Sequence, residues 1–274
     1  MSLFCFAGNQ IRPIDEAGVP VTDLLVQRGY GIFDFLRVAK DKPLFIEDHL
    51  DRFFHSASIM RLNIPQTRED IKAIVQELIQ KNQLPYSGIR MLIAGGDAPD
   101  GYTIEHPHLI IIQAPLAEPT PELPQEGINL ATYSYARQIP EVKTTDYLMA
   151  IWLQPWMKSQ GADDILYQQD GWVTECPRSN FFLVTDQGVL VTADKKMLNG
   201  VTRKNIIKVC AQNSIPLEIR PVHMNEFATA REAFITSSTK RIIPVHQIDK
   251  QILKPDYASS MAKKVYDLLV ALEG

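Results

Sequence analysis

The sequence has little of what marks several broad classes of protein. Its three cysteines, Cys5, Cys176 and Cys210, are odd in number and widely spaced, which is typical neither of a disulfide framework nor of a zinc site. No apolar run approaches the roughly 18 residues of a membrane span, and the first residues lack the basic and apolar regions of a signal peptide. A net charge of −4 argues against nucleic acid as the main partner. We therefore expect a cytoplasmic protein with no nucleic-acid or membrane partner.

The histidines also give no sign of a metal site. His106 and His108 flank Pro107, but no acidic or cysteine ligand set accompanies them, so we expect ordinary loop and strand residues and no metal. The composition, 45% hydrophobic and 22% charged, is that of a globular protein. A chain of 274 residues is long enough for one large domain or two medium ones, and it contains no internal repeat.

Hydrophobic periodicity and breaker residues predict a two-domain protein of the α/β or α+β class. Residues 1–115 alternate between strand patterns and helix patterns, with strands expected at 33–38, 89–93 and 108–112 and helices at 46–60 and 67–81. Prolines then crowd the segment 116–124, which predicts an interdomain linker. The larger second domain, residues 125–274, is expected to contain a strand at 128–135, helices from about Asp146, from Arg203 to Asn213 and from Tyr257, and strands near Leu217 and Phe234.

Two separate stretches carry the chemistry of the second domain. Lys143 comes just before an apolar helical run, and Glu175 lies between two strand-like runs, 164–167 and 181–184. An amine that can form a Schiff base and a carboxylate that can pair with a ring nitrogen are the groups that pyridoxal phosphate requires of a protein. Each residue alone is more typical of a solvated surface charge, so the interpretation depends on sites for a phosphate and for a substrate carboxylate.

Three features provide candidate phosphate ligands. Gly200 precedes a predicted helix, so the backbone amides of Val201 and Thr202 would point out of its positive end, although a plain helix cap has the same pattern. The hydroxyl-rich segment 236–239 follows a predicted strand and would donate hydrogen bonds, or cap a turn. Arg52 has the planar guanidinium that pairs with phosphate in a bidentate way, although an arginine on such a helix ordinarily faces solvent.

Taken together and in this order, the segments resemble the class IV, or fold-type IV, pyridoxal-phosphate enzymes. This family contains branched-chain transaminases, D-amino acid transaminases and aminodeoxychorismate lyases. The resemblance runs from about residue 28 to 250 and rests on segments 28–34, 49–52, 161–164, 173–182, 198–203 and 238–245 together with Lys143. The sequence departs from the family pattern at Asp146, where Asn is usual, and at Asp34, where Glu is common. The fold implied is a small N-terminal α/β domain with a larger pseudo-barrel domain.

The resemblance also implies a role for each matching residue. Lys143 forms the Schiff base and moves the proton in a ping-pong cycle, and Glu175 pairs with the pyridinium nitrogen. Further cofactor ligands are Arg52, Tyr147, Asn180, Val201, Thr202 and Ser238. The substrate side is expected to involve Arg28, Phe33, Arg90, Arg178, Ser237 and Thr239. The family forms homodimers, in which the loop of Arg28 would reach the active site of the neighbouring subunit.

The positions of the arginines suggest which substrate the protein binds. The arginine that familiar D-amino acid transaminases carry just beyond the strand 89–93 is absent, because Ala94-Gly95-Gly96 stands there. Arg28, Arg90 and Arg178 are candidate replacements, since a desolvated guanidinium requires an anion. An ion pair with the protein would explain each of them equally well. We therefore expect small-molecule amino-acid and keto-acid substrates, and a D-amino acid transaminase that uses D-glutamate or D-alanine with 2-oxoglutarate.

Three alternatives remain open. The turn at 236–239 replaces the Gly-Thr-Ala-like stretch with which branched-chain transaminases hold the carboxylate, but an L-branched-chain enzyme is the main alternative. An aminodeoxychorismate lyase would need no amino acceptor. A catalytically inactive binding protein would keep the fold, but the presence of Lys143 and Glu175 argues against it.

Overall fold

A computed structural model describes residues 2–118, 120–253 and 256–274, which divide into two compact units. The first unit contains Met1–Glu118 and Val142–Asp146, and the second contains Pro119–Glu141 and Tyr147–Gly274. The chain thus passes from one unit to the other within the proline-rich segment 116–124, of which residue 119 lies outside the described residues. It then returns to the first unit for five residues, which the expected range 125–274 for the second domain does not anticipate.

The first unit is built on an antiparallel sheet of six strands, in the order β2-β1-β6-β5-β3-β4. The strands are β1 (Phe4–Ala7), β2 (Gln10–Pro13), β3 (Gly31–Ala39), β4 (Lys42–Pro43), β5 (Tyr86–Ala94) and β6 (His108–Pro115). The helical segments are η1 (Ile14–Glu16), α1 (Leu24–Arg28), α2 (Ile46–Ile59) and α3 (Arg68–Asn82). The strands and helices expected in this half are confirmed, and the N-terminal hairpin of β1 and β2 is an addition.

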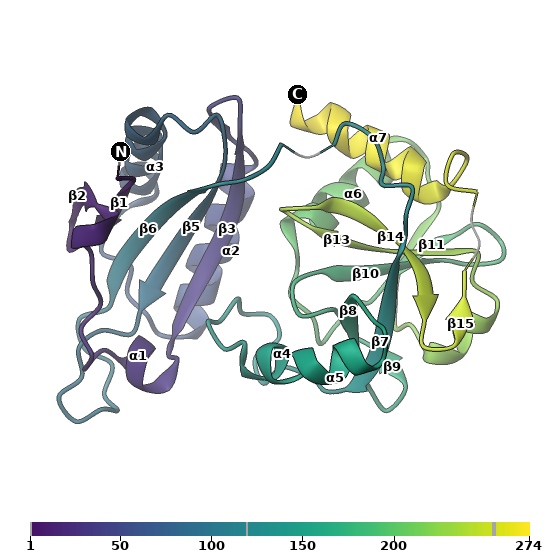
Figure 1. The fold of residues 1–274 in the computed structure, drawn as a ribbon, viewed down its shortest axis with the longest axis horizontal. Coiled ribbons are helices and arrows are strands. Elements are labelled where there is room, and N and C mark those ends of the chain that lie inside the picture. Colours follow the sequence, from purple (N-terminus) through teal and green to yellow (C-terminus); the bar gives the residue numbers. More distant parts are fainter. Residues whose placement is uncertain (1, 119, 254–255) are drawn as a thin grey trace. The chain divides into compact units, whose positions relative to one another are not determined.

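Helices α2 and α3 cover the same face of this sheet (Figure 1). The apolar side chains of α2 recur at helical spacing, so Leu50, Phe53 and Ala57 are all buried against the strands. Thr67 caps α3 as predicted, because its hydroxyl accepts a hydrogen bond from the amide of Asp70 while the Asp70 carboxylate accepts from the amide of Thr67. This packing fixes α2, which carries Arg52, against β3.

The second unit contains a sheet of nine strands, in the order β12-β11-β10-β13-β14-β7-β8-β9 with β15 paired to β14. The strands are β7 (Ile128–Ser134), β8 (Asp164–Gln169), β9 (Trp172–Val173), β10 (Asn180–Val184), β11 (Leu190–Thr192), β12 (Leu217–Ile219), β13 (Glu232–Ser237), β14 (Arg241–Ile248) and β15 (Gln251–Ile252). A hydrogen bond of 2.9 Å from the amide of Val173 to the carbonyl of Val222 joins β9 to the segment after β12. The sheet is therefore curled into the expected pseudo-barrel.

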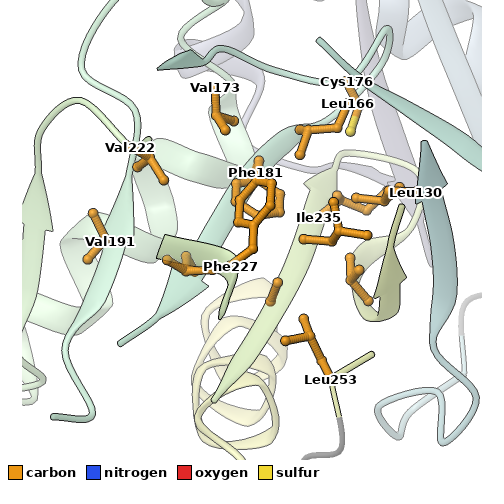
Figure 2. Close-up of a cluster of buried hydrophobic side chains, with 14 residues drawn as sticks. Leu130, Leu166, Val173, Cys176, Phe181, Val191, Val222, Phe227, Ile235 and Leu253 are labelled. Atoms are coloured by element: carbon orange, nitrogen blue, oxygen red, sulfur yellow. The ribbon is translucent and has the colours of Figure 1, made fainter. Parts of the chain in front are cut away.

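The curled sheet encloses one apolar cluster that draws on strands from its whole width (Figure 2). Phe181 of β10 lies at its centre and makes an edge-on contact with Phe227, with ring centroids 6.0 Å apart. Cys176 is also buried there, and burial raises the pKa of its thiol well above the ordinary value. Cys176 is therefore a packed thiol of low reactivity.

Helices account for the remaining elements of the second unit: α4 (Leu148–Trp152), α5 (Gln154–Ser159), α6 (Val201–Gln212), α7 (Met261–Glu273) and the short η2 (Met224–Ala228). The single helix expected from about Asp146 is wrong: Pro155 in the first turn of α5 has no N–H to continue the hydrogen bonding of α4. The C-terminal helix begins at Met261 rather than Tyr257, because Ser260 caps it. Within the described ranges, no helix is long and apolar enough to cross a membrane.

Candidate active site

Lys143 belongs to the first unit because its backbone pairs with β3. The amide of Phe33 donates to the carbonyl of Lys143 at 2.9 Å, and the amide of Thr145 donates to the carbonyl of Gly31 at 3.0 Å. A side chain at Gly31 would meet the carbonyl of Ile93, so the close approach of these strands requires glycine. Lys143 is thus held by an extended segment on the sheet, and not by the helix α4 that follows it.

The ammonium group of Lys143 lies 4.6 Å from the centroid of the Phe33 ring. The guanidinium of Arg90, on the neighbouring strand β5, lies 5.5 Å from the same centroid. Three of the residues selected from the sequence, Lys143, Phe33 and Arg90, therefore share one side of β3 and β5. Arg90 is otherwise exposed, so its charge is accessible to an anionic ligand.

Behind this cluster lies a buried ionic network around Asp34. Arg52 donates through Nε to Oδ2 of Asp34 and through Nη2 to Oδ1, both at 2.8 Å, and His49 Nδ1 lies 2.6 Å from Oδ1. Burial alone would raise the pKa of Asp34, but Arg52 and His49 outweigh it and hold this pKa well below the usual range. Burial lowers the pKa of His49, with smaller contributions from Arg52 and Lys143, and Asp34 opposes that shift. The network fixes the orientation of the Arg52 guanidinium.

Glu175 of the second unit is buried and has a defined partner on each carboxylate oxygen. Arg137 donates through Nε to Oε1 at 2.8 Å, and the backbone amide of Leu198 donates to Oε2 at 3.0 Å. A second guanidinium nitrogen of Arg137 donates to the carbonyl of Pro140. Each oxygen of the Glu175 carboxylate is thus held in place by a donor. Arg137 was not among the residues selected from the sequence, because nothing in Ala136-Arg137-Gln138 distinguishes it from a surface charge.

The start of α6 has the features of an anion site. Its N-terminal cap is Gly200, which has no side chain to accept from the first amides, and its first turn contains no acidic residue. A side chain at Gly200 would collide with Oδ1 of Asn180. Asn180 is itself fixed, because its amide donates to the carbonyl of Leu198 at 2.7 Å. The amides of Val201 and Thr202 therefore stand next to Asn180.

The other residues selected in this unit lie in turns nearby. Ser237 ends β13, and its hydroxyl lies 3.2 Å from that of Thr239 in the turn that also holds Ser238. Arg178 occupies the tip of a tight turn closed by hydrogen bonds between Cys176 and Ser179. The pairing of Asn180 with Thr236 places both turns at the same end of β10 and β13.

Two other selected residues have less defined surroundings. Tyr147 is the half-buried residue at the start of α4. Arg28 is exposed at the end of α1, where it donates locally, to the carbonyl of Gln27.

These donors fit a phosphorylated cofactor with a basic ring nitrogen. The start of α6 offers backbone amides without a competing side-chain acceptor, and two buried donors near it, the Thr236 hydroxyl and the Asn205 amide, have no hydrogen-bond partner in the described part of the chain. A buried orphan donor is costly unless a ligand or water satisfies it. Glu175 has the carboxylate that a ring nitrogen would need, and Lys143 has the primary amine that an aldehyde would need.

Comparison with known proteins decides the family. The model of the family described as amino-transferase class IV matches residues 31–248, which is most of the chain. The chain belongs to the class IV aminotransferases. As a member, it is a pyridoxal-phosphate-dependent transaminase, which confirms the cofactor and the reaction type expected from the sequence.

Two curated relatives show how far the similarity extends. A putative branched-chain-amino-acid aminotransferase of Methanocaldococcus jannaschii is 28% identical over 261 residues, which is 91% of this chain and 89% of that protein. A D-alanine aminotransferase of Bacillus licheniformis is 26% identical over 260 residues, with coverage of 93% and 91%. Relatives of both specificities are thus about equally similar, and they do not distinguish D- from L-substrates.

A solved structure shows the same fold. The branched-chain aminotransferase from the thermophilic archaeon Thermoproteus uzoniensis, crystallised with norvaline, superposes with a TM-score of 0.88 at 23% identity, over 100% of this chain and 96% of that one. The expected mixed α/β fold of type IV is confirmed.

Proposed function

We propose that this class IV aminotransferase moves an amino group between a D-amino acid of the D-glutamate or D-alanine type and a 2-keto acid such as 2-oxoglutarate. The observation that carries the proposal is the position of Arg90, whose guanidinium shares the Phe33 ring with the ammonium of Lys143. A transaminase must hold the substrate α-carboxylate within a few ångströms of the carbon whose proton the lysine moves. Arg90 supplies a cation for that carboxylate.

The remaining roles follow from the chemistry of each side chain. When bound, pyridoxal phosphate supplies the electron-withdrawing ring that stabilises negative charge on the substrate Cα. Lys143 would hold the cofactor through its aldehyde and would move the proton at the substrate Cα, and Glu175, which accepts a hydrogen bond from Arg137, would hold the ring nitrogen. The phosphate would be held by Arg52, by the amides of Val201 and Thr202 and by Ser238. Tyr147 and Asn180 complete the cofactor ligands.

The substrate side involves further residues in both units. We propose that Arg28 and Arg178 provide cations for carboxylates, with Arg28 acting on the neighbouring subunit of a homodimer. Both are exposed, so neither charge is consumed by a buried ion pair. Ser237 and Thr239 offer hydroxyls at the turn after β13. Two or more arginines suit a dicarboxylate such as glutamate or 2-oxoglutarate.

A branched-chain L-amino acid transaminase is the second candidate, and it is favoured by the relative from Methanocaldococcus jannaschii that bears that name. An enzyme of that type would place an aliphatic side chain where the present proposal needs cations. The two candidates therefore differ in a measurable way, namely in their dependence on Arg90 and Arg28.

The test is a half-reaction measured by absorbance. The cofactor-loaded protein is mixed with D-glutamate and, separately, with L-leucine, and the conversion of the lysine-bound cofactor to its pyridoxamine form is followed. Fast conversion by D-glutamate alone supports the proposal, and the reverse result makes the protein a branched-chain enzyme. No conversion by either, with turnover of aminodeoxychorismate in the absence of a keto acid, would make it a lyase.

The arginine variants complete the test. Arg90→Ala and Arg28→Ala should each raise the KM for 2-oxoglutarate by about tenfold or more, since each removes a hydrogen-bonded charge worth about 1.5–3 kcal/mol. Arg68→Ala on α3, which removes an exposed arginine paired with Asp51, is the matched control and should leave this KM unchanged. Wild-type KM values in both active-site variants would show that these arginines do not bind the substrate.

A further inference from the structure

Thr236 is a buried residue of β13, and it is the first residue of the hydroxyl-rich segment 236–239 that the sequence offers as a candidate phosphate site. It is 2% exposed, and within the described ranges its Oγ1 has no hydrogen-bond partner. An unsatisfied buried hydroxyl costs about 1–3 kcal/mol, and in native proteins it usually indicates a bound water, ion or ligand. The resemblance that suggested Ser237, Ser238 and Thr239 did not extend to Thr236.

The sheet register shows which way the Thr236 side chain points. Thr236 is paired with Asn180 across β10 and β13, so the two side chains lie on the same face of the sheet. The next pair on that face is Phe182 and Phe234, whose rings stack at 5.0 Å in the cluster that also contains Ile206 of α6. Thr236 therefore faces the layer of α6 and not the interior of the pseudo-barrel.

The contacts of Asn180 show that Thr236 lies near the first turn of α6. Its amide donates to the carbonyl of Leu198, and its Oδ1 occupies the space that a side chain on Gly200 would need. Asn180 therefore touches the cap of the helix, and its cross-strand neighbour Thr236 lies next to it on the same face. A second buried orphan donor, Nδ2 of Asn205, lies one turn into α6. Side chains of a helix lean toward its N-terminus, which brings this amide toward the same place.

We propose that the Thr236 hydroxyl donates a hydrogen bond to the phosphate of the cofactor, as a ligand additional to the α6 amides and Ser238. The inference rests on the proposed position of the phosphate at the start of α6. It explains why a hydroxyl without a hydrogen-bond partner in the described residues is buried at this position. It also explains why the chain provides no acceptor of its own there: the cap is glycine and the first turn has no acidic residue.

The experiment compares the affinity of the apoprotein for two ligands, pyridoxal phosphate and pyridoxal, which lacks the phosphate. Thr236→Val keeps the shape of the side chain and removes the hydroxyl. The substitution should lower the affinity for pyridoxal phosphate by about ten- to a hundredfold, which is what the loss of a hydrogen bond to a charged group costs. It should leave the affinity for pyridoxal unchanged. Thr236→Ser should restore most of the affinity. Thr185→Val, beyond the opposite end of β10, should change neither affinity.

The thermal stability of the apoprotein provides a readout independent of the cofactor. Because the hydroxyl has no protein partner in the described residues, Thr236→Val should leave the apoprotein melting temperature unchanged or raise it. A lower melting temperature with unchanged affinity for pyridoxal phosphate would overturn the inference and assign Thr236 to the packing.

Equal losses of affinity for pyridoxal phosphate and for pyridoxal would also overturn the inference about Thr236. Val201→Pro separates this failure from failure of the proposed phosphate position, because proline is tolerated at the first position of a helix and removes the backbone amide of Val201. If Val201→Pro selectively weakens the affinity for pyridoxal phosphate and Thr236→Val does not, only the role of Thr236 is refuted. If neither weakens it, the phosphate does not bind at the start of α6 and both proposals fail.

Discussion

Replacing Asp34 by asparagine tests whether its buried ionic network holds the first unit together. The substitution keeps the size of the side chain and removes its charge. Asp34 is fully buried, and its two oxygens accept two hydrogen bonds from Arg52 and contact His49 at 2.6 Å. Removing one partner of a buried ion pair leaves the other charge without compensation, at a cost of about 3–5 kcal/mol. We expect Asp34→Asn to lower the free energy of unfolding of the first unit by this amount at neutral pH.

The same substitution should change the acid sensitivity of the protein. The pKa of Asp34 in the folded protein lies well below its usual range, so the unfolded chain binds the proton more readily than the folded one. The stabilisation is therefore fully present above the unfolded pKa of about 3.9 and is lost as pH falls through the folded pKa. The difference in unfolding free energy between the wild type and Asp34→Asn should be constant above about pH 5 and shrink below about pH 4.

The assay is urea unfolding of the apoprotein, which avoids any contribution from lost cofactor binding. Far-UV circular dichroism follows both units, whereas the tryptophans, Trp152, Trp156 and Trp172, all lie in the second unit. The variant should shift the dichroism transition without an equal shift in tryptophan fluorescence. Asp51→Asn on α2, next to Arg52 in the sequence, is the control: its ion pair with Arg68 is exposed and contributes at most about 1 kcal/mol. If Asp34→Asn costs no more than Asp51→Asn, the reasoning is refuted.

Two further substitutions test the second unit. Glu175→Gln should lower kcat by about a hundredfold or more, since the amide cannot keep the ring nitrogen protonated. The control Glu218→Gln, at an exposed position, should leave kcat unchanged. Equal kcat values for the two variants would show that Glu175 does not belong to the site. Gly200→Ala should cost about 1–3 kcal/mol in stability or cofactor binding, because the new methyl group meets the fixed Asn180. The control Gly18→Ala, with open space around it, should cost nothing. If Gly200→Ala changes neither thermal unfolding nor cofactor titration, the helix start tolerates a side chain.

The elements that the sequence predicted correctly are those that depend on local signals. Helix α3 has a threonine cap, acidic residues in its first turn and an apolar stripe, and it begins one residue after Thr67. Helix α6 was expected from Arg203 and begins two residues earlier, at Val201, directly after the glycine that marks its start. The helix expected from about Asp146 was wrong because the apolar pattern continues through Pro155 while the hydrogen bonding does not.

The sequence suggests candidate site residues where they match a family motif, but it does not reveal contacts that depend on strand register. Asp34 was noted only as a departure from the usual glutamate, although it orients Arg52. Arg137 meets Glu175 across 38 residues of sequence. Thr236 faces α6 only because it is paired with Asn180, and a shift of one residue would turn it into the pseudo-barrel. No local pattern encodes such pairings.

Lys143 shows how the local sequence around a candidate residue can suggest the wrong structural support. Its neighbourhood in the sequence is the helix that follows, so a position at the mouth of that helix was the natural expectation. In the structure its carbonyl and the neighbouring amide of Thr145 are bonded to β3, and its ammonium lies over Phe33 of the same strand. The segment Val142–Asp146 belongs to the first unit, where the sheet holds it. We therefore expect the placement of the Lys143 amine to depend on the stability of this sheet and of the Asp34 network behind it, and not on α4.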